Sequence, residues 1–559
     1  MAPPDRFSRY RSQPTVVTGL RGLLRTIDGE TFHAYRRILG EHELGDFSLT
    51  VLSVPPDALG GPARVRLSID RARAGLEGTW SRGEVARLVL EDAIVRAASR
   101  ALDELSGPSP SSAPGSGRVS IEPPGPELAC RTIATVGDQR LDLALAIDLP
   151  AAARRVRGLQ AEEILFDHMP RVGMAALLFP LRRLNEVRPL VAAVARRQAV
   201  AESLAARGLA ALVPSAGGTT LETPDGPVSG LAIPTGITLF VTSRISGAGA
   251  WLRDLVAPSA AVGQRGAILA GPVATLRASR RAFGPLDVRA FVKACADVPH
   301  PEAYVTEACP PPLAVAASLI EAVEAGARIV VLDEDESPAG VFASGERLQG
   351  ILGGPASLSP LTERLPELRD RWGLSFFIAA RAMGSLCDIA DSVFVLGDDR
   401  IADVTDAAVG PRRISARRPR MPAQAMGARP TTRSMRIVTE DAPGRLRVSS
   451  WGSRGVRVGD DLVDLRDTTL VRDVALLRAV AALMKRAAAE AAAWRPVEDV
   501  LDTLEAATAR PVLDRLEEPG LVDLARPSRI EIAAALVRWK RVTFRVAAGT
   551  LSATVEDPQ

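Results

Sequence analysis

Hydrophobic and polar residues recur along the N-terminal part of the chain with two different periods. Apolar side chains occupy every second position over 64–69 and again over 141–147, which is typical of strands with one buried face. Residues 83–104 instead carry apolar side chains at helical spacing, and a long helical region is predicted from about 156 to 210. This part of the chain therefore predicts an α+β arrangement.

The pattern changes between residues 228 and 410. Short aliphatic runs, separated by helical stretches, stand at Ile237–Val241, Ile329–Leu332, Phe376–Ala379 and Ser392–Leu396. Strands that are buried on both faces and joined by helices are typical of a parallel sheet. The predicted fold class is therefore α/β, with a mostly parallel sheet in the core and with flanking α+β N-terminal and mixed C-terminal domains.

At 559 residues the chain is too long for a single hydrophobic core. One stretch rich in Pro, Ser and Gly and another rich in Arg and Pro suit connecting segments, because neither composition builds a core. The predicted division is an N-terminal α+β domain at 1–105, a Pro/Ser/Gly linker at 106–118, a second N-terminal α+β region at 119–225, a core at 226–410, an Arg/Pro-rich linker at 411–436 and a C-terminal region at 437–559.

Composition narrows the class of protein further. Hydrophobic residues make up 47% and charged residues 24%, as in ordinary globular proteins, and the net charge of +3 does not by itself favour nucleic acid. The four cysteines show no C-x-x-C spacing, which argues against a zinc site. The start of the chain lacks an apolar signal region, and no stretch reaches about 18 uninterrupted apolar residues. We therefore expect a cytoplasmic protein with no membrane partner.

The aliphatic run at 329–332 ends in two acids, Asp333 and Glu334. An Asp at the end of a buried parallel strand can hold the Mg²⁺ shell of a nucleotide, and the Glu after it can polarise an attacking water. We therefore predict Asp333 as a metal ligand and Glu334 as a catalytic residue. The alternative is that both acids only mark the return of the chain to solvent.

The aliphatic run at 237–241 leads into a loop of small residues and then into a predicted helix. A strand, a small-residue loop and a helix N-terminus together can bind phosphate through backbone N–H groups and the helix dipole. The predicted nucleotide-binding residues are Ser246, Gly247, Ala248, Gly249 and Ala250.

This loop matches the phosphate-binding pattern G-x-x-x-x-G-K-[ST] at one key position only, Gly247. Thr242 replaces the first glycine, Ala248 replaces the lysine, and Gly249 replaces the hydroxyl residue. The chain has three lysines, and the nearest, Lys293, is too far along the sequence to substitute locally. Judged by residue spacing alone, the match of this loop to the phosphate-binding pattern is therefore weak.

A series of further blocks recurs in a recognisable order. These are 24–36 (LRTIDGETFHAYR), 62–67 (PARVRL), 147–155 (IDLPAAARR), 230–239 (GLAIPTGITL), 320–327 (IEAVEAGA), 332–337 (LDEDES), 347–349 (RLQ), 388–391 (DIAD) and 530–538 (IEIAAALVR). In order and spacing they resemble the bacterial ABC-class ATPase family, long P-loop proteins with flanking domains. The resemblance implies an ABC-type P-loop NTPase core, ATP and Mg²⁺ as cofactors, and a homodimer of the kind that ABC engines form.

The departures from the family pattern concern the catalytic parts. The family's signature-like loop aligns with Cys309 and the three prolines 310–312, and proline supplies no N–H donor. The family's switch region is replaced by residues 380–388, and its lysine and hydroxyl by Ala248 and Gly249. Phosphoryl transfer depends on positioning and on charge neutralisation. We therefore predict a pseudo-ATPase that binds ATP at reduced affinity and hydrolyses it weakly or not at all.

Two other functions stay open at this point. An Arg-rich surface would suit a nucleic-acid-binding or scaffold protein, although a solvated linker and strand face explain the same residues. The predicted nucleic-acid contacts are Arg64, Arg66, Arg412, Arg413, Arg417 and Arg418. The chain could also be an active ATPase that a partner, or a basic residue at a non-standard position, completes.

Overall fold

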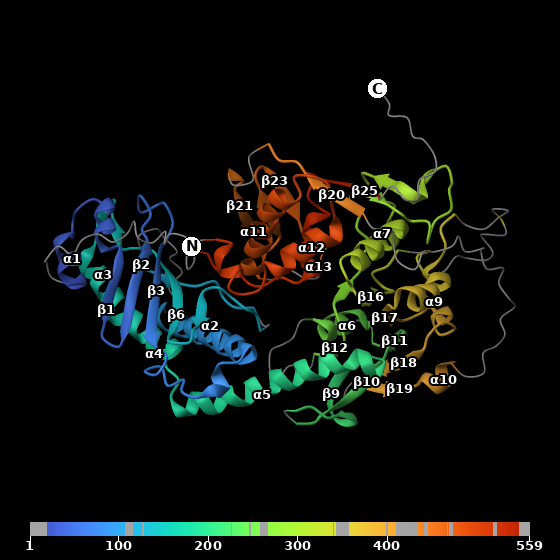
Figure 1. The fold of residues 1–559 in the computed structure, drawn as a ribbon, viewed down its shortest axis with the longest axis horizontal. Helices are drawn as coiled ribbons and strands as arrows, with labels where there is room; N and C mark the ends of the chain where they lie inside the picture. The colour runs from blue at the N-terminus through green and yellow to red at the C-terminus, as the bar shows by residue number, and fades with distance from the viewer. Residues whose placement is uncertain are drawn as a thin grey trace, which may run out of the picture. The chain divides into compact units, whose positions relative to one another are not determined.

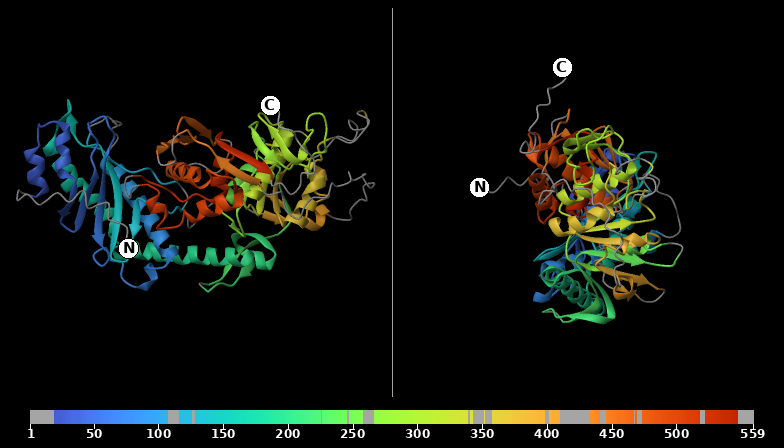
Figure 2. Two further views of the ribbon diagram at one scale, coloured as in Figure 1. Left: turned by 45° about the horizontal axis from the view of Figure 1, so that its top comes forward. Right: turned by 90° about the vertical axis from the view of Figure 1, so that its right-hand side faces the viewer.

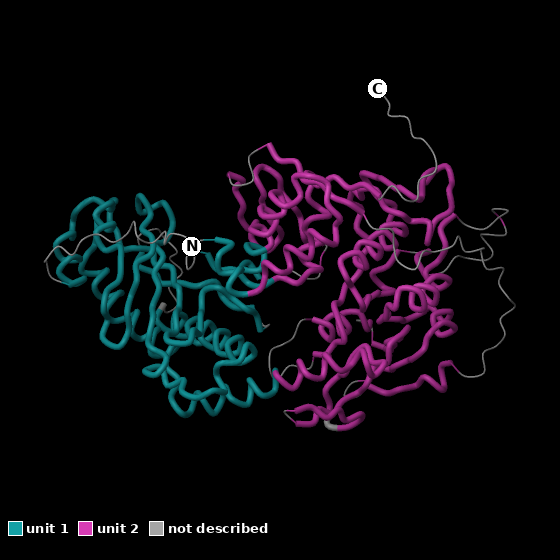
Figure 3. The backbone as a smooth tube through the Cα atoms, in the orientation of Figure 1, with its two compact units in different colours: residues 1–194, 473–479, 510–526 teal, residues 195–472, 480–509, 527–559 magenta. Residues whose placement is uncertain are grey.

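The computed structural model describes residues 19–106, 116–125, 128–224, 226–244, 247–257, 266–338, 340–342, 351, 357–397, 401–409, 433–440, 445–466, 468, 473–517 and 522–546. The chain forms two compact units, each assembled from segments that are far apart in the sequence (Figure 3). The first unit comprises Met1–Val194, Asp473–Ala479 and Arg510–Arg526, and the second comprises Ala195–Arg472, Val480–Ala509 and Pro527–Gln559.

An antiparallel sheet in the order β1-β2-β3-β6-β4, with β5 also paired to β6, lies at the centre of the first unit (Figure 1). Its strands are β1 Gly40–Leu44, β2 Phe47–Ser53, β3 Ala63–Asp70, β4 Val119–Ser120, β5 Ala134–Val136 and β6 Arg140–Ile147. Leu67 pairs with Leu143 in register, and both are buried. Helices α2, Glu84–Ser106, and α4, Met169–Leu177, pack together and against this sheet. The strands predicted at 64–69 and 141–147 and the helix predicted at 83–104 are confirmed.

The helical region predicted from about 156 to 210 is divided into shorter helices. They are α3 Gly158–Glu163, the π-helix η4 Ile164–His168, α4, α5 Leu181–Leu204 and the 3-10 helix η5 Ala205–Arg207. The break before α5 has a local cause, because Pro180 disfavours helical backbone at Phe179, directly before it. Helix α4 has already ended there, with Leu178 extended as its C-cap. Helix α5 continues through Pro189 and is the long teal-green helix of Figure 1 and Figure 2.

No single helix among the described residues combines the length and the apolar character that a membrane crossing requires. One pair, Gly158–Leu177 and Leu181–Arg207, meets both criteria jointly but is bent by 47°.

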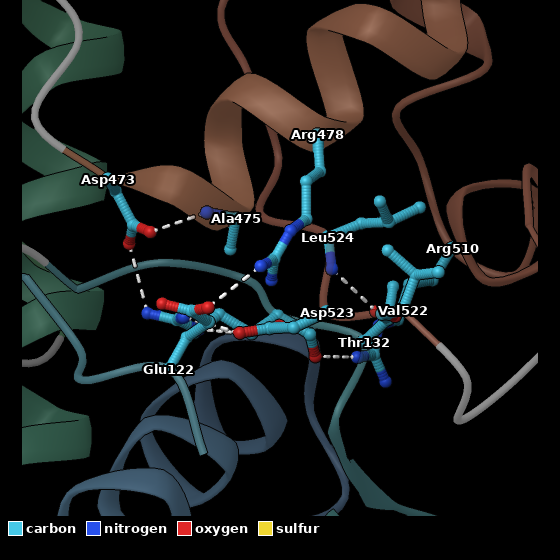
Figure 4. A network of polar contacts seen from close by, with 10 residues as sticks. Glu122, Thr132, Asp473, Ala475, Arg478, Arg510, Val522, Asp523 and Leu524 are labelled. Carbon is cyan, nitrogen blue, oxygen red and sulfur yellow. Dashed lines mark hydrogen bonds and ion pairs between the residues drawn. The ribbon is translucent and has the colours of Figure 1, made fainter. Parts of the chain in front are cut away.

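A buried arginine, Arg131, ties the C-terminal segments of the chain into the first unit, and Figure 4 shows Thr132, Asp473 and Asp523 of this network. The Arg131 side chain is 1% exposed and donates hydrogen bonds to the carboxylates of Asp523 and Asp473, the latter at 2.9 Å. Thr132 beside it donates its hydroxyl to the Val522 carbonyl at 3.1 Å. A buried guanidinium without a partner would be strongly destabilising, so these carboxylates stabilise the packing of both segments against residues 131–132.

A six-stranded sheet in the order β13-β16-β17-β11-β18-β19 forms the core of the second unit (Figure 1). Its strands are β11 Ile237–Val241, β13 Val273–Thr275, β16 Ile329–Asp333, β17 Ser375–Ala380, β18 Ser392–Leu396 and β19 Ile401–Asp403. The first five strands are parallel, and β19 pairs with β18 antiparallel. The four strands predicted from aliphatic runs, and with them the α/β class, are confirmed.

Three helices accompany this sheet: α6 Gly249–Val256, α7 Pro311–Glu324 and α9 Leu361–Trp372. Phe240 of β11, Val331 of β16 and Phe377 of β17 form one apolar cluster with Leu252 of α6. A smaller sheet, β10-β9-β12, stands beside the core: β9 Leu209–Leu221, β10 Val228–Pro234 and β12 Ile268–Leu269. Two further short strands, β14 Phe283–Leu286 and β15 Tyr304–Thr306, pair before α7.

The described residues of the C-terminal part include two small sheets and three α-helices. The strands are β20 Arg433–Ile437, β21 Val448–Trp451, β22 Gly455–Val458, β23 Asp461–Asp464, β24 Arg495–Pro496 and β25 Val542–Val546. The helices are α11 Val474–Glu490, α12 Val497–Ala506 and α13 Arg529–Leu536. Helix α13 begins with a complete capping box between Ser528 and Glu531, which satisfies two N–H groups at its start.

The Arg/Pro-rich linker predicted at 411–436 needs a correction at its end. Arg433 lies in β20, is 2% exposed, and donates to Glu324 of α7 at 2.6 Å. Its guanidinium also lies 4.2 Å from the centre of the Phe544 ring. The opposite charge and the ring offset the cost of burying this arginine, so the strand extends into the predicted linker. The other predicted boundaries stay predictions.

Candidate functional site

The carboxyl ends of the parallel strands meet at one edge of the sheet, which is where α/β sheets bind their ligands. Val241 ends β11 there, and the Thr242 hydroxyl after it donates to the Leu396 carbonyl at the end of β18, at 3.2 Å. The Arg244 N–H donates to the same hydroxyl at 3.2 Å, and the Gly247 N–H donates to the Arg244 carbonyl at 3.1 Å. These contacts hold Thr242, Arg244 and Gly247 close to the end of β18. Ser246, predicted to bind nucleotide, lies outside the described residues.

Helix α6 begins directly after this turn, as the sequence predicts. Ala248, at the position of the phosphate-binding lysine, is 3% exposed and belongs to the apolar cluster with Phe240 and Leu252. Its methyl group faces the core of the unit, so the position supplies neither an ammonium nor any other charge. Ala250 is exposed on the first turn of α6.

Gly249 lies against the acid that the sequence predicts as a metal ligand. A Cβ placed on Gly249 would overlap Oδ2 of Asp333, the last residue of β16. The carboxylate therefore fills the space that a side chain at this position would need. The structure thus brings Gly249 and Asp333 together, but the two residues pack directly against each other.

Both oxygens of the Asp333 carboxylate accept a hydrogen bond from a protein group. Its Oδ2 accepts a hydrogen bond from Arg253 Nη1 at 3.1 Å, and its Oδ1 accepts one from the Asp335 N–H at 3.0 Å. Burial raises the pKa of Asp333, and the Asp335 N–H and Arg253 oppose that rise. The counter-charge of Asp333 is therefore the guanidinium of Arg253, a residue of the same chain.

Arg253 joins Asp333 to a second acid and a second arginine. Its Nη1 lies 3.0 Å from Glu336 Oε1, and Glu336 Oε2 lies 2.9 Å from Nε of Arg277, which follows β13. The four side chains alternate in charge and sum to zero. We call them the Arg253 cluster.

A Mg²⁺ ion does not fit this arrangement. Magnesium requires nearly octahedral oxygen ligands at about 2.0–2.1 Å. Gly249 offers no hydroxyl, and both oxygens of Asp333 already accept hydrogen bonds. Across the described ranges, no group of three or more His, Cys, Asp or Glu side chains is placed to hold a metal. The chemistry of the donor set therefore disagrees with the metal that the family resemblance implies.

Glu334, the predicted catalytic residue, is tied to the loop after β17. Its carboxylate accepts hydrogen bonds from three successive backbone N–H groups, those of Arg381 at 2.8 Å, Ala382 at 3.2 Å and Met383 at 3.3 Å. These donors occupy the oxygens that would otherwise accept a proton from an attacking water. Residues 380–388, which replace the family's switch region, thus bind the Glu334 carboxylate through backbone N–H groups.

One further ion pair lies over the loop. Asp335 Oδ2 is 2.9 Å from Nη2 of Arg381, and both groups stand close to Gly247. A Cβ on Gly247 would come within 2.6 Å of Asp335 Oδ2 and 2.8 Å of Arg381 Nη2, so glycine is required there, as its φ of +70° also indicates. An acid therefore lies against the backbone that would bind phosphate.

The loop that aligns with the family signature also lacks donors. Helix α7 begins at Pro311 with Pro310 as its N-cap, so its first turn offers fewer N–H groups than an ordinary helix start. Cys309 before it is buried, and burial raises the pKa of its thiol. This helix start is therefore poorly suited to hold a phosphate group.

Of the predicted nucleic-acid contacts, the structure describes Arg64 and Arg66. They lie on β3 of the first unit, where both are half-buried and alternate with the fully buried Ala63, Val65 and Leu67. Burial lowers the pKa of Arg64, and Arg478 lowers it further, while Glu122 and Asp523 raise it. These acids come from segments that no alternation pattern reveals. Arg412, Arg413, Arg417 and Arg418 lie outside the described residues.

Sequence reasoning missed the arginines of the site, Arg253, Arg277 and Arg381. The one available signal was the position of Arg253, one helical turn after Gly249 and therefore on the same face of α6. Its partner Asp333 is 80 residues away in the sequence, and no local pattern connects the two.

Three family models match successive parts of the chain. Residues 17–179 match the N-terminal domain of ATPases of the ABC class, residues 192–433 match the P-loop domain of the ABC ATPase model, and residues 447–545 match the MRB1590 C-terminal domain. No curated protein sequence matches the chain. The family models agree with the resemblance of the blocks described above and with the strand, loop and helix geometry around Gly247. The chain belongs to the ABC-class ATPase family.

Proposed function

We propose that this family member is a pseudo-ATPase that binds adenine nucleotide weakly and hydrolyses it poorly or not at all. The observation that carries the proposal is the buried methyl group of Ala248, which stands where the family has a phosphate-binding lysine. An ammonium at this position neutralises the β- and γ-phosphates, and a methyl group cannot.

The state of Glu334 supports the same conclusion. A catalytic acid must be within hydrogen-bond reach of the water that it orients. Here the Arg381, Ala382 and Met383 amides hold the carboxylate. Releasing it would exchange those hydrogen bonds for hydrogen bonds to water, which costs about 0.5–1.5 kcal/mol for each bond. Efficient turnover would have to overcome that cost at each cycle.

The remaining binding capacity lies in the backbone. The turn at Gly247 and the first N–H groups of α6 are the parts of the P-loop that attract phosphate without any side chain. The Asp335–Arg381 ion pair beside Gly247 brings no net positive charge to replace the missing lysine. We therefore expect a dissociation constant for ATP weaker than about 0.1 mM.

Calorimetric titration of the full chain with ATP tests the proposal, with Gly247→Ala as the loop variant. The variant should lose the binding heat, because a Cβ at that position meets Asp335 and Arg381 and strains the turn. Gly384→Ala is the matched control, since a Cβ there meets nothing within 4 Å. If the wild type gives no binding heat with ATP, the proposed nucleotide binding is wrong. Submicromolar ATP binding together with turnover would contradict the proposed weak binding and weak hydrolysis.

A further inference from the structure

The Arg253 cluster lies where a nucleotide-bound metal would be held in an intact P-loop site. In such a site the metal is shared between a hydroxyl at the start of the helix and an acid at the end of another strand of the sheet. These two positions are Gly249 and Asp333 in this chain, and the space between them is closed. Arg253 then approaches Asp333 from one turn further along α6.

The Arg253 cluster is neutral without a metal. Arg253 has a side chain that is 22% exposed and contacts both Asp333 and Glu336, whereas Asp333 is 11% exposed. Arg277 neutralises the second acid. A partly buried carboxylate needs a counter-charge, and a guanidinium keeps its charge throughout the physiological range. Unlike a metal ion, it cannot dissociate from the chain.

We propose that Arg253 performs the charge-neutralising role that Mg²⁺ has in P-loop ATPases, so that this site takes no divalent metal and receives nucleotide as the metal-free anion. The nucleotide part rests on the proposed function, and the metal part does not. Arg253 acts here as a positioning residue through Asp333. Its guanidinium excludes the metal by occupying the acid that would bind it.

Substitutions test whether the Arg253 guanidinium is what excludes a metal ion from Asp333. Arg253→Gln removes the charge and shortens the side chain, which leaves Asp333 and Glu336 available to a cation. Adding Asp333→Asn to the Arg253→Gln variant removes the carboxylate that would bind the cation. Arg369→Ala is the matched control, because Arg369 also pairs with an aspartate of this unit, Asp391 at 2.6 Å, which accepts from the N–H at the start of β11.

Electron paramagnetic resonance of Mn²⁺ with the full-length protein measures metal binding directly, without nucleotide. Wild type and Arg369→Ala should leave the free Mn²⁺ signal undiminished, Arg253→Gln should bind Mn²⁺, and the double variant with Asp333→Asn should lose that binding. Mn²⁺ binding by the wild type that Asp333→Asn abolishes would overturn the inference. So would an Arg253→Gln protein that keeps the wild-type circular dichroism spectrum and binds no Mn²⁺.

A fluorescent ATP analogue, titrated in Mg²⁺ and in EDTA, gives the second readout. The wild-type affinity should agree between the two buffers within about twofold, whereas Arg253→Gln should bind more tightly in Mg²⁺ by about fivefold or more. A wild-type affinity that falls by about tenfold in EDTA would contradict the inference. If the wild type binds no analogue in either buffer, the proposed function fails, while the Mn²⁺ experiment still decides the role of Arg253.

Discussion

Arg253 Nη1 lies 3.1 Å from Asp333 Oδ2, with Gly249 packed against the same oxygen. The acid that would hold a metal in an intact P-loop ATPase is thus neutralised by a side chain of the helix that follows the loop. The absence of a hydroxyl residue at position 249 and the presence of the Arg253–Asp333 ion pair depend on each other. Any side chain at position 249 would displace the Asp333 carboxylate from the Arg253 guanidinium. The consequences can be tested at several positions.

Gly249→Ala should destabilise the protein, because its Cβ would overlap Asp333 Oδ2. The carboxylate would have to withdraw from Arg253 or the helix start would have to shift, at an expected cost of about 2 kcal/mol. Thermal unfolding followed by circular dichroism measures the change. Gly384→Ala should leave the melting temperature unchanged, since a Cβ there meets no atom within 4 Å. Equal melting temperatures for the two variants would contradict the packing described for Gly249.

Ala248→Lys should not restore an ATPase and should lower stability. The methyl group of Ala248 lies in the apolar cluster with Phe240 and Leu252, so a lysine would bring an ammonium into apolar surroundings. Chemical denaturation should show a loss of about 2 kcal/mol or more. Ala250→Lys, at an exposed position of the same helix, is the control and should stay within about 0.5 kcal/mol of wild type. A stable Ala248→Lys protein that hydrolyses ATP would contradict this prediction.

Arg131→Ala should release the C-terminal segments from the first unit. The substitution leaves the Asp523 and Asp473 carboxylates without their guanidinium, and breaking a buried ion pair in this way costs about 3–5 kcal/mol. Hydrogen exchange should rise in 473–479 and 510–517. Arg140→Ala is the control, because Arg140 and its partner Glu41, 3.6 Å away, have half-exposed side chains. Unchanged protection in Arg131→Ala would show that Arg131 does not hold these segments.

Glu91 should make the stability of the first unit depend on pH. Burial raises its pKa to about 7, against the opposing effects of Arg510 and the Val136 N–H. Between about 4.5 and 7 the folded chain therefore holds a proton that the unfolded chain has lost, so the contribution of Glu91 to stability falls as pH rises. The full effect of this shift is about 3 kcal/mol.

Melting temperatures measured from pH 5 to pH 8 test this dependence. Wild type should lose more stability across the range than Glu91→Gln, which has no charge to bury. Asp138→Asn is the control, because Asp138 is an exposed acid whose ion pair with Arg87 should contribute little. Parallel pH profiles for wild type and Glu91→Gln would show that Glu91 does not titrate in this range.

Much of the core fold could be predicted from the sequence. The runs at 237–241, 329–332, 376–379 and 392–396 are strands because continuous aliphatic residues suit burial on both faces of a sheet. The position of the loop before α6 follows from the same pattern. Local periodicity encodes these elements, so a single sequence suffices to place them.

The ion pairs that define the site could not be predicted, because they depend on which strand ends become neighbours. Arg253 and Asp333 are 80 residues apart, and Arg131 and Asp523 are 392 residues apart. The assembly of each unit from distant segments depends on pairs of this kind. The sequence shows that Ala248 cannot act as a lysine, whereas the direction of its methyl group, into the core, follows only from the packing of α6.

The central claim is that the chain does not turn over ATP through Glu334. The most direct test is phosphate release from Mg-ATP by wild type and by Glu334→Gln, each purified in the same way, beside a protein-free blank. Both proteins should release phosphate at the rate of the blank. Steady release by the wild type that Glu334→Gln abolishes would contradict the account.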